Sequence, residues 1–262
     1  MVHANEFSYG PLIPALAVAM SCLGSFLGLR CATRARAYEG SARVRWLLLA
    51  AVSIGAAGIW VMHNIALLSF TIPGQTILYD VPISIGSALV AVAVVFAALL
   101  VAGIGSQSFP PLLLGGVIIG FGVLASMDYV GMAAMRMPDT IEYNTWVVLL
   151  SALIAVTGAV FSLWAALRLR GLGSTVAASV VMGAGISGMH YTAMTAMRFV
   201  AAPQANMGGG ATTGEFVLPL VLTVSVLTIV LIASVALSPT EEEIHAEAIL
   251  SERLARRQRR SV

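Results

Sequence analysis

Seven long runs of apolar residues divide the chain, and short polar segments separate them. Each run approaches the roughly 20 residues that a helix needs to cross the hydrocarbon core of a bilayer. Small residues inside the runs, as in Gly55-x-x-Gly58 and Gly183-x-Gly185, allow helices to pack closely. The pattern predicts an all-α integral membrane fold with seven transmembrane helices, which we place at residues 11–30, 46–70, 82–102, 110–135, 146–168, 174–198 and 216–237.

Composition supports this fold and excludes one class of seven-helix protein. Of the 262 residues, 59% are apolar and only 10% are charged, whereas a soluble domain usually carries about 25% charged residues. All fourteen basic residues are arginine. Because the chain has no lysine, it cannot form a retinal Schiff base, and a rhodopsin-like photoreceptor is excluded.

The placement of the arginines predicts how the bundle is oriented. Cytoplasmic loops of membrane proteins carry an excess of basic residues, and here arginine gathers after the first apolar run and in the tail. We therefore expect an external N-terminal segment at 1–10, a seven-helix membrane domain at 11–237 and a cytoplasmic tail at 238–262. The tail opens with Ser238-Pro239-Thr240-Glu241, which is typical of a helix start, and it is too short to be a catalytic output domain.

Three related segments recur along the chain, centred on His63, Asp128 and His190. We call them the first motif (58–68), the second motif (125–135) and the third motif (188–197). Their centres are 65 and 62 residues apart, so each period spans one pair of helices. This spacing predicts three two-helix repeats followed by one closing helix, with N-terminus outside, C-terminus inside and all three motifs near the outer face.

The residue types in the motifs indicate a metal site. Imidazole suits copper, and thioether sulfur is soft and selects Cu(I). Polar groups are costly in lipid, so they should face the bundle interior. His190, Met194 and Met197 have the spacing of a stripe on one helical face. The candidate metal ligands are His63, His190, Met62, Met127, Asp128, Met132, Met189 and Met194.

Methionine also fills gaps in helix packing, so packing is the alternative interpretation of these residues. However, eight of the twelve methionines belong to the three motifs or their immediate ends. Random placement of core filler would not favour equivalent positions in three repeats, and the distribution therefore favours a binding site.

The third motif contains Met189-His190-Tyr191-Thr192, which resembles the signature of the bacterial MHYT domain. The resemblance extends over residues from about 7 to 237. It implies a multi-pass sensory and signalling module of the bacterial cytoplasmic membrane, which binds copper near the outer face and senses a diatomic gas such as O2, CO or NO. Many members are fused to cyclic-di-nucleotide or kinase output modules, so the resemblance also implies a separate cytoplasmic signalling protein as partner.

The chain departs from the family pattern at two motifs. In the first motif, Asn64 replaces an aromatic residue and Leu67 replaces a methionine, and in the second motif Asp128 replaces histidine. Asp128 could be an anionic ligand, which would shift the preference towards Cu(II) or Zn(II). It could also pair with His63 or His190, or it could be an incidental residue of the vestibule.

Two other functions are compatible with the sequence. His63 and His190 could be axial ligands of a haem or redox cofactor, with Arg136 and Arg198 as anchors for its propionates. The chain could instead handle or deliver copper, although its predicted helices have few ionisable residues at mid-membrane, where transporter sites usually lie. No nucleophile with a positioned base indicates an enzyme, and we expect the lipid bilayer, not a nucleic acid, as its environment.

Overall fold

The computed structural model describes residues 10–71, 77–103, 109–137, 139–169, 171–201 and 209–239, together with Glu243 and Leu250. The predicted segment 1–10 and the predicted helical tail 238–262 lie almost entirely outside these residues. Within them, seven helical spans are long and apolar enough to cross a membrane, which confirms the predicted number: Leu12–Ala37, Gly40–Leu68, Val81–Ala102, Phe109–Gly131, Thr145–Arg168, Leu172–Thr195 and Thr213–Ala236.

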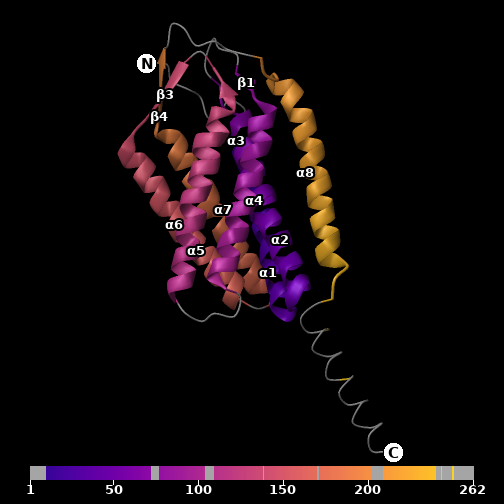
Figure 1. Cartoon of the computed structure of the whole chain (residues 1–262). Coiled ribbons are helices and arrows are strands. Elements are labelled where there is room, and N and C mark those ends of the chain that lie inside the picture. Colours follow the sequence, from indigo (N-terminus) through magenta and orange to yellow (C-terminus); the bar gives the residue numbers. More distant parts are fainter. Residues whose placement is uncertain are drawn as a thin grey trace, which may run out of the picture.

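The spans form one upright bundle (Figure 1). Two of them change helix type along their length, since the second and the fourth each contain a π-helical segment. The elements are α1 (Leu12–Ala37), α2 (Gly40–Ala51), η1 (Val52–Trp60), α3 (Val61–Leu68), β1 (Leu78–Tyr79), α4 (Val81–Ala102), α5 (Phe109–Val123), η2 (Leu124–Gly131), β2 (Met135–Arg136), β3 (Asp139–Tyr143), α6 (Thr145–Arg168), α7 (Leu172–Thr195), β4 (Met197–Ala201) and α8 (Thr213–Ala236).

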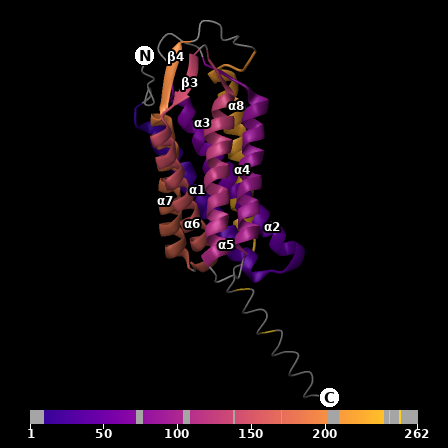
Figure 2. The same cartoon turned by 60° about the vertical axis from the view of Figure 1, so that its left-hand side comes forward.

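The two ends of the bundle differ in content. One end, at the top of Figure 2, carries α3, the end of α7 and the strands β3 and β4, and it holds His63 and His190. We call it the histidine end. At the opposite end, α1 turns into α2 and both α6 and α8 finish, close to Arg34 and Arg36. We call it the arginine end.

Short strands close the histidine end, and the sequence pattern did not predict them. β1 pairs antiparallel with β2, and β3 pairs antiparallel with β4. The predicted helices ending at 135 and 198 therefore stop earlier, at Gly131 and Thr195. The predicted helical stripe of His190, Met194 and Met197 is wrong only at its last member: His190 and Met194 lie buried in α7, but Met197 lies in β4.

The caps of the helices follow from local chemistry. Asp80 accepts a hydrogen bond from the Ile83 amide at 3.1 Å and so satisfies a free amide in the first turn of α4. Thr212 and Glu215 form a reciprocal capping box at the start of α8. Both caps lie at the histidine end, where these helices begin.

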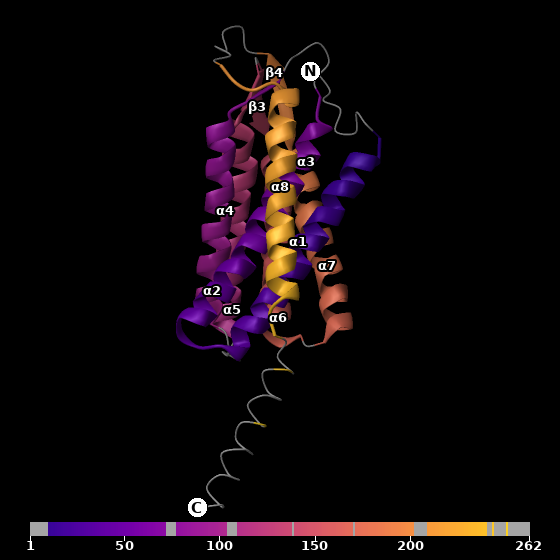
Figure 3. The ribbon, with the colours of Figure 1, turned by 90° about the vertical axis from the view of Figure 1, so that its right-hand side faces the viewer.

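Glycines allow the helix backbones to approach closely, as the sequence predicted for Gly55-x-x-Gly58 and Gly183-x-Gly185. A β-carbon on Gly183 would lie 2.7 Å from the backbone nitrogen of Cys22, so α7 and α1 could not pack as they do with a larger residue. Gly24, which the sequence analysis did not single out, has the same role: its β-carbon would lie 2.3 Å from the backbone nitrogen of Gly58. Helix α1 runs obliquely across the bundle (Figure 3).

Large apolar side chains cover the outside of the bundle. Leu89 of α4, Leu153 of α6 and Ile229 of α8 are 67%, 60% and 66% exposed. Such surfaces are unfavourable in water and are what a lipid-facing helix requires. Helix α8 stands at the periphery in Figures 1 and 3, and it joins α1 and η1 through a small cluster of Leu231, Leu27 and Ala57.

Candidate metal centre

The histidines of the first and third motifs face each other inside the bundle. His63 lies in α3 and His190 lies in α7, and each side chain is 1% exposed. Their Nδ1 atoms are 3.3 Å apart, and the imidazole rings meet edge to face, with centroids separated by 4.8 Å. Residues 127 positions apart thus form one buried pair.

This separation permits two states of the pair. Without a metal, the Nδ1–H of one ring donates to the Nδ1 of the other. With a metal, both Nδ1 atoms could be ligands. Metal–nitrogen bonds of about 2.0–2.1 Å at a tetrahedral angle place two ligand nitrogens about 3.3 Å apart. The pair therefore fits a tetrahedral or trigonal metal ion.

The second motif contributes to the same place through its backbone. A β-carbon on Gly131 would lie 2.8 Å from Nε2 of His63, so only glycine lets the backbone lie against this ring edge. His63 Nε2 is buried and has no hydrogen-bond partner among the described residues. A buried polar atom without a partner is costly, and on this side of the ring His63 meets the second motif at Gly131.

The thioethers of the candidate set are all in the core. Their exposed fractions are 3% or less, and the residues are Met62, Met127, Met132, Met189 and Met194. Asp128 lies in η2, but its side chain lies outside the described part of the structure. Among the described side chains, no cluster of three or more histidine, cysteine or carboxylate groups could hold a metal, so further ligands would have to be thioethers or Asp128.

A small polar network fixes the helix that carries His63. Asn64 donates from Nδ2 to the Trp60 carbonyl at 2.8 Å, and its Oδ1 accepts from the Ser84 hydroxyl at 3.3 Å. The Trp60 indole donates to the Ser84 carbonyl at 2.8 Å. These contacts tie η1 and α3 to α4. They explain why an amide stands at position 64, where the family pattern has an aromatic residue.

Strand pairing and one ion pair cover the site on the side of the histidine end. Arg136 of β2 forms a salt bridge with Asp80, and the Asp80 amide donates to the Ala134 carbonyl at 2.7 Å. The Arg136 guanidinium, together with the Ile83 amide, holds the pKa of Asp80 below its usual value. Arg136 is therefore already paired with a carboxylate.

Sequence reasoning found the histidine pair but missed three of its supports. Asn64 was noted only as a departure from the family, Ser84 was not noted, and Gly131 lies within the second motif but was given no role there. A signal for Gly131 does exist in the sequence, since this glycine, three residues after Asp128, interrupts a segment that is otherwise predicted to be helical. Nothing in the sequence indicates that Ser84 faces Asn64.

Comparison with known proteins identifies the family of the chain. A family model described as the MHYT bacterial signalling protein N-terminal repeat matches the chain twice, at residues 57–116 and 120–179. The chain belongs to the MHYT family. Each matched MHYT repeat starts close to one of the first two motifs. The chain is a multi-pass protein of the bacterial inner membrane.

Signalling proteins are among the relatives of this MHYT chain. It is 34% identical over 262 residues to the bifunctional diguanylate cyclase/cyclic di-GMP phosphodiesterase MucR of Pseudomonas aeruginosa, an alignment that covers 96% of this chain and 37% of that protein. It is 34% identical over 196 residues to the cyclic di-GMP phosphodiesterase NbdA of the same organism, with 72% and 24% coverage. It is also 27% identical over 206 residues to the signaling protein YkoW of Bacillus subtilis, with 73% and 24% coverage.

The MHYT chain thus spans less than two fifths of the length of these relatives. No solved structure matches it significantly. Its family membership makes the chain a sensory signalling module. The enzymatic activities for which its relatives are named belong to those full-length proteins.

Proposed function

We propose that this MHYT module binds copper through His63 and His190 and responds to a diatomic gas. The observation that carries the proposal is the buried pair of Nδ1 atoms 3.3 Å apart, contributed by two separate motifs. Two neutral imidazoles and several buried thioethers form a donor set that suits a soft ion in an apolar environment. Bound copper would supply a redox-active centre with affinity for O2, CO or NO.

The residues around the pair hold it in place. The network of Trp60, Asn64 and Ser84 fixes α3, and Gly131 lies against the ring edge of His63. The walls exclude water, because both rings are almost fully buried. A metal ligand whose neighbours are fixed loses less conformational freedom on binding, and such supporting contacts commonly change metal affinity by about 10- to 100-fold.

The alternative of a haem between the two histidines is less favoured. A porphyrin plane needs space between two axial rings, whereas these rings are in edge contact with centroids 4.8 Å apart. Arg136, one of the two expected propionate anchors, is paired with Asp80. The copper-handling alternative shares the same ligands and differs only in what the bound ion is for.

Signal output would reach cyclic di-nucleotide turnover through the end of α8 or through a separate cytoplasmic protein. Two relatives are named for cyclic di-GMP enzymes, and this supports the proposal. Output through the end of α8 requires the histidine end to face outwards, and the arginine distribution favours this orientation. A reporter fused after Val262 should read cytoplasmic and one inserted at Gly209 external, and the opposite result at both sites would reverse the orientation.

Metal analysis and a visible spectrum of the purified protein test the proposed site. Wild type should contain copper and lack a haem spectrum. His63→Ala and His190→Ala should each release the metal, whereas Met20→Leu, which lies outside the motifs, should retain it. Full metal content in the double alanine variant would refute a shared site and favour methionine binding or pure packing.

Asp128→His tests whether the second motif also supplies a ligand. If position 128 faces the site, a third imidazole should raise copper affinity or stoichiometry above wild type. If Asp128 instead pairs with a histidine, the variant should be less stable in metal-free buffer and rescued by metal. Unchanged metal content and unchanged melting temperature would exclude position 128 from both roles, and Asp128→Leu is the matched control for loss of charge alone.

A further inference from the structure

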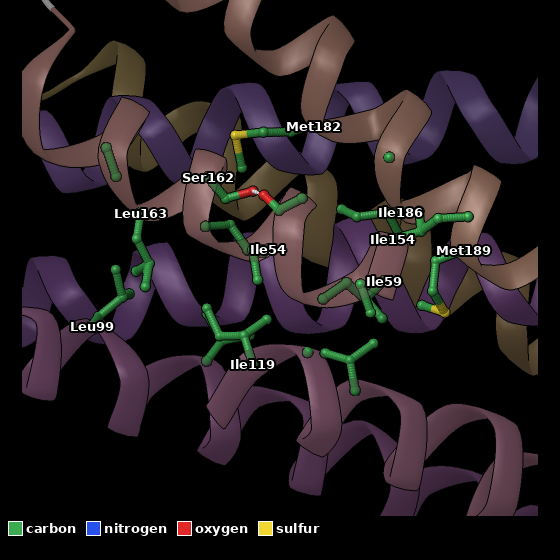
Figure 4. A pocket seen from close by; sticks show the side chains of 18 residues that line it. Ile54, Ile59, Leu99, Ile119, Ile154, Ser162, Leu163, Met182, Ile186 and Met189 are labelled. Atoms are coloured by element: carbon green, nitrogen blue, oxygen red, sulfur yellow. Dashed lines mark hydrogen bonds between the residues drawn. The ribbon is translucent and has the colours of Figure 1, made fainter. Parts of the chain in front are cut away.

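An apolar cavity lies between the helices of the bundle. It has a free volume of about 40 Å³ and is lined by residues of η1, α4, α5, α6 and α7. Figure 4 shows its walls as a row of aliphatic side chains, with Leu99 and Leu163 at one end and Ile59 and Met189 at the other.

The cavity is chemically unsuited to water. Its walls contain one hydroxyl side chain, Ser162, and this hydroxyl already donates to the Gly158 carbonyl at 2.7 Å. A buried water needs about two to four polar partners, and these walls do not provide them. Apolar cavities of this kind stay dry and accept apolar guests.

The volume selects the size of the guest. One water molecule needs a cavity volume of about 10–15 Å³, and an engineered cavity of about 150 Å³ takes up benzene or xenon. A volume of about 40 Å³ therefore suits one molecule of diatomic size. An aromatic ring or a length of acyl chain is too large.

The wall between α6 and α7 offers a route from the lipid. Gly158 and Gly185 face each other there: a β-carbon on Gly185 would lie 3.9 Å from the Gly158 Cα, and one on Gly158 would meet nothing within 4 Å. Ile154 and Ile186, which also line the cavity, are only half-buried. Diatomic gases dissolve better in hydrocarbon than in water, so the bilayer is their natural reservoir.

The other end of the cavity is lined by residues that are close to the motif histidines along the chain. Ile59 precedes His63 by four residues on the same continuous span, and Met189 directly precedes His190. Figure 4 shows Ile59 and Met189 beside each other at this end of the cavity. A guest at this end would thus contact the residue that precedes His190 and a residue one helical turn before His63.

We propose that this cavity is a binding site for one apolar molecule of diatomic size, which enters from the bilayer between α6 and α7 and is held beside the histidine pair. The identity of the guest as a gas rests on the proposed function. The capacity to bind a small apolar molecule does not, because it depends only on the shape and polarity of the cavity.

Xenon binding to metal-free protein in lipid nanodiscs, followed by xenon NMR, tests the site. Gly158→Leu should fill the cavity, because the added side chain starts in open space, and Gly185→Val is a second plug from the opposite wall. Gly86→Leu is the matched control: it lies in α4, outside the cavity lining, and its β-carbon also meets nothing within 4 Å. Wild type and Gly86→Leu should bind xenon saturably. Gly158→Leu and Gly185→Val should each weaken xenon binding at least about tenfold, because the added side chain occupies the cavity.

Oxygen provides a second measurement on the same proteins. Dissolved O2 should relax the methyl protons of Ile119, inside the cavity, more strongly than its local lipid exposure predicts, with lipid-facing Ile229 as reference. The excess should disappear in Gly158→Leu. Weak, non-saturating xenon signals that are equal in wild type, both plugs and the control would overturn the proposal, as would a lipid chain occupying the cavity.

The double variant His63→Ala, His190→Ala separates this inference from the proposed function. Its cavity is intact, so xenon binding should persist while metal is lost. If xenon binds but wild type never holds metal, the cavity proposal stands and the copper proposal fails. If metal binds but xenon does not, the copper proposal stands and the cavity proposal fails.

Discussion

The histidine end and the arginine end both bury polar side chains, but they use them differently. At the arginine end, Arg34 of α1 donates to the Val235 and Ser238 carbonyls at 2.5 and 3.0 Å, and Arg36 donates to the Leu167 and Leu169 carbonyls at 2.7 and 2.9 Å. These carbonyls are the acceptors that every helix leaves unpaired at its C-terminus. The two arginines therefore cap α8 and α6.

At the histidine end, the two motif histidines are paired with each other across the bundle. His63 and His190 share at most one proton between facing nitrogens, and His63 Nε2 lacks a hydrogen-bond partner among the described residues. An arrangement that leaves a buried atom unsatisfied is a poor way to stabilise a bundle. Buried polar groups that satisfy backbone carbonyls, as Arg34 and Arg36 do, are part of the fold, whereas a side-chain pair that meets between two motifs is the better candidate for a binding site.

Arg34→Ala should produce the largest loss of stability. The change removes two charge-assisted hydrogen bonds to the end of α8 and the contact of the guanidinium with the Trp46 ring, whose centroid is 5.4 Å away. Hydrogen bonds to charged groups contribute roughly 1.5–3 kcal/mol each, so we expect the loss of two to lower the free energy of unfolding by about 3–6 kcal/mol. Thermal unfolding in detergent, followed by tryptophan fluorescence, measures it.

Arg45→Ala is the control for Arg34, because Arg45 belongs to the same basic segment but is exposed. It should leave unfolding almost unchanged. Both variants should keep the metal content of wild type, since the arginine end is remote from the histidine pair. Normal stability in Arg34→Ala would show that the basic segment acts only through orientation in the membrane.

Gly131→Ala should produce an intermediate effect, confined to the metal. The new β-carbon would lie 2.8 Å from Nε2 of His63, so the imidazole must move and its Nδ1 must leave its position opposite His190. We expect metal affinity to fall about tenfold, which is typical when a supporting contact of a ligand is disturbed. Competition with a calibrated copper chelator measures the affinity.

Gly188→Ala is the control for Gly131. It lies in the third motif, and its β-carbon meets nothing within 4 Å, so copper affinity should not change. Equal affinities in wild type, Gly131→Ala and Gly188→Ala would mean that His63 is not a ligand.

The combined change His63→Leu, His190→Leu should have a smaller effect on the metal-free fold. It removes both polar partners together, which is often nearly neutral for stability, and we expect a change within about 1 kcal/mol. His190→Leu alone should be worse than the pair, because it leaves His63 with no partner at either nitrogen. Chemical unfolding of the three proteins tests this order, and additive losses would contradict it.

The sequence predicted the seven spans because a helix that crosses the bilayer needs about 20 apolar residues. This signal can be recognised in each segment separately. The sequence also brought His63 and His190 together through the repeat. It could not predict β1 to β4, since two-residue and five-residue strands at helix ends carry no periodicity of their own. Ser84, Gly24 and the cavity depend on which helix faces which, and apolar residues on every side of a helix conceal its buried face.

The ion pair of Asp80 with Arg136 gives the smallest expected effect and tests whether the lid of the histidine end is electrostatic. Arg136, and then the Ile83 amide, hold the folded-state pKa of Asp80 below its usual value of about 3.9. Because the folded pKa is the lower one, the pair stabilises the fold at pH values above the unfolded-state pKa. This contribution is lost as pH falls below about 4, through the folded-state pKa.

The melting temperature of wild type should decrease slightly below about pH 4. The melting temperature of Asp80→Asn should already be lower at neutral pH, and it should depend less on pH across the acidic range. The change should be small, because Arg136 is 37% exposed and exposed ion pairs contribute little. Glu142→Gln, on exposed β3, is the control and should keep the acidic decrease. If Asp80→Asn and wild type lose stability in parallel, strand pairing alone closes the histidine end, and its polar groups matter only where His63 meets His190.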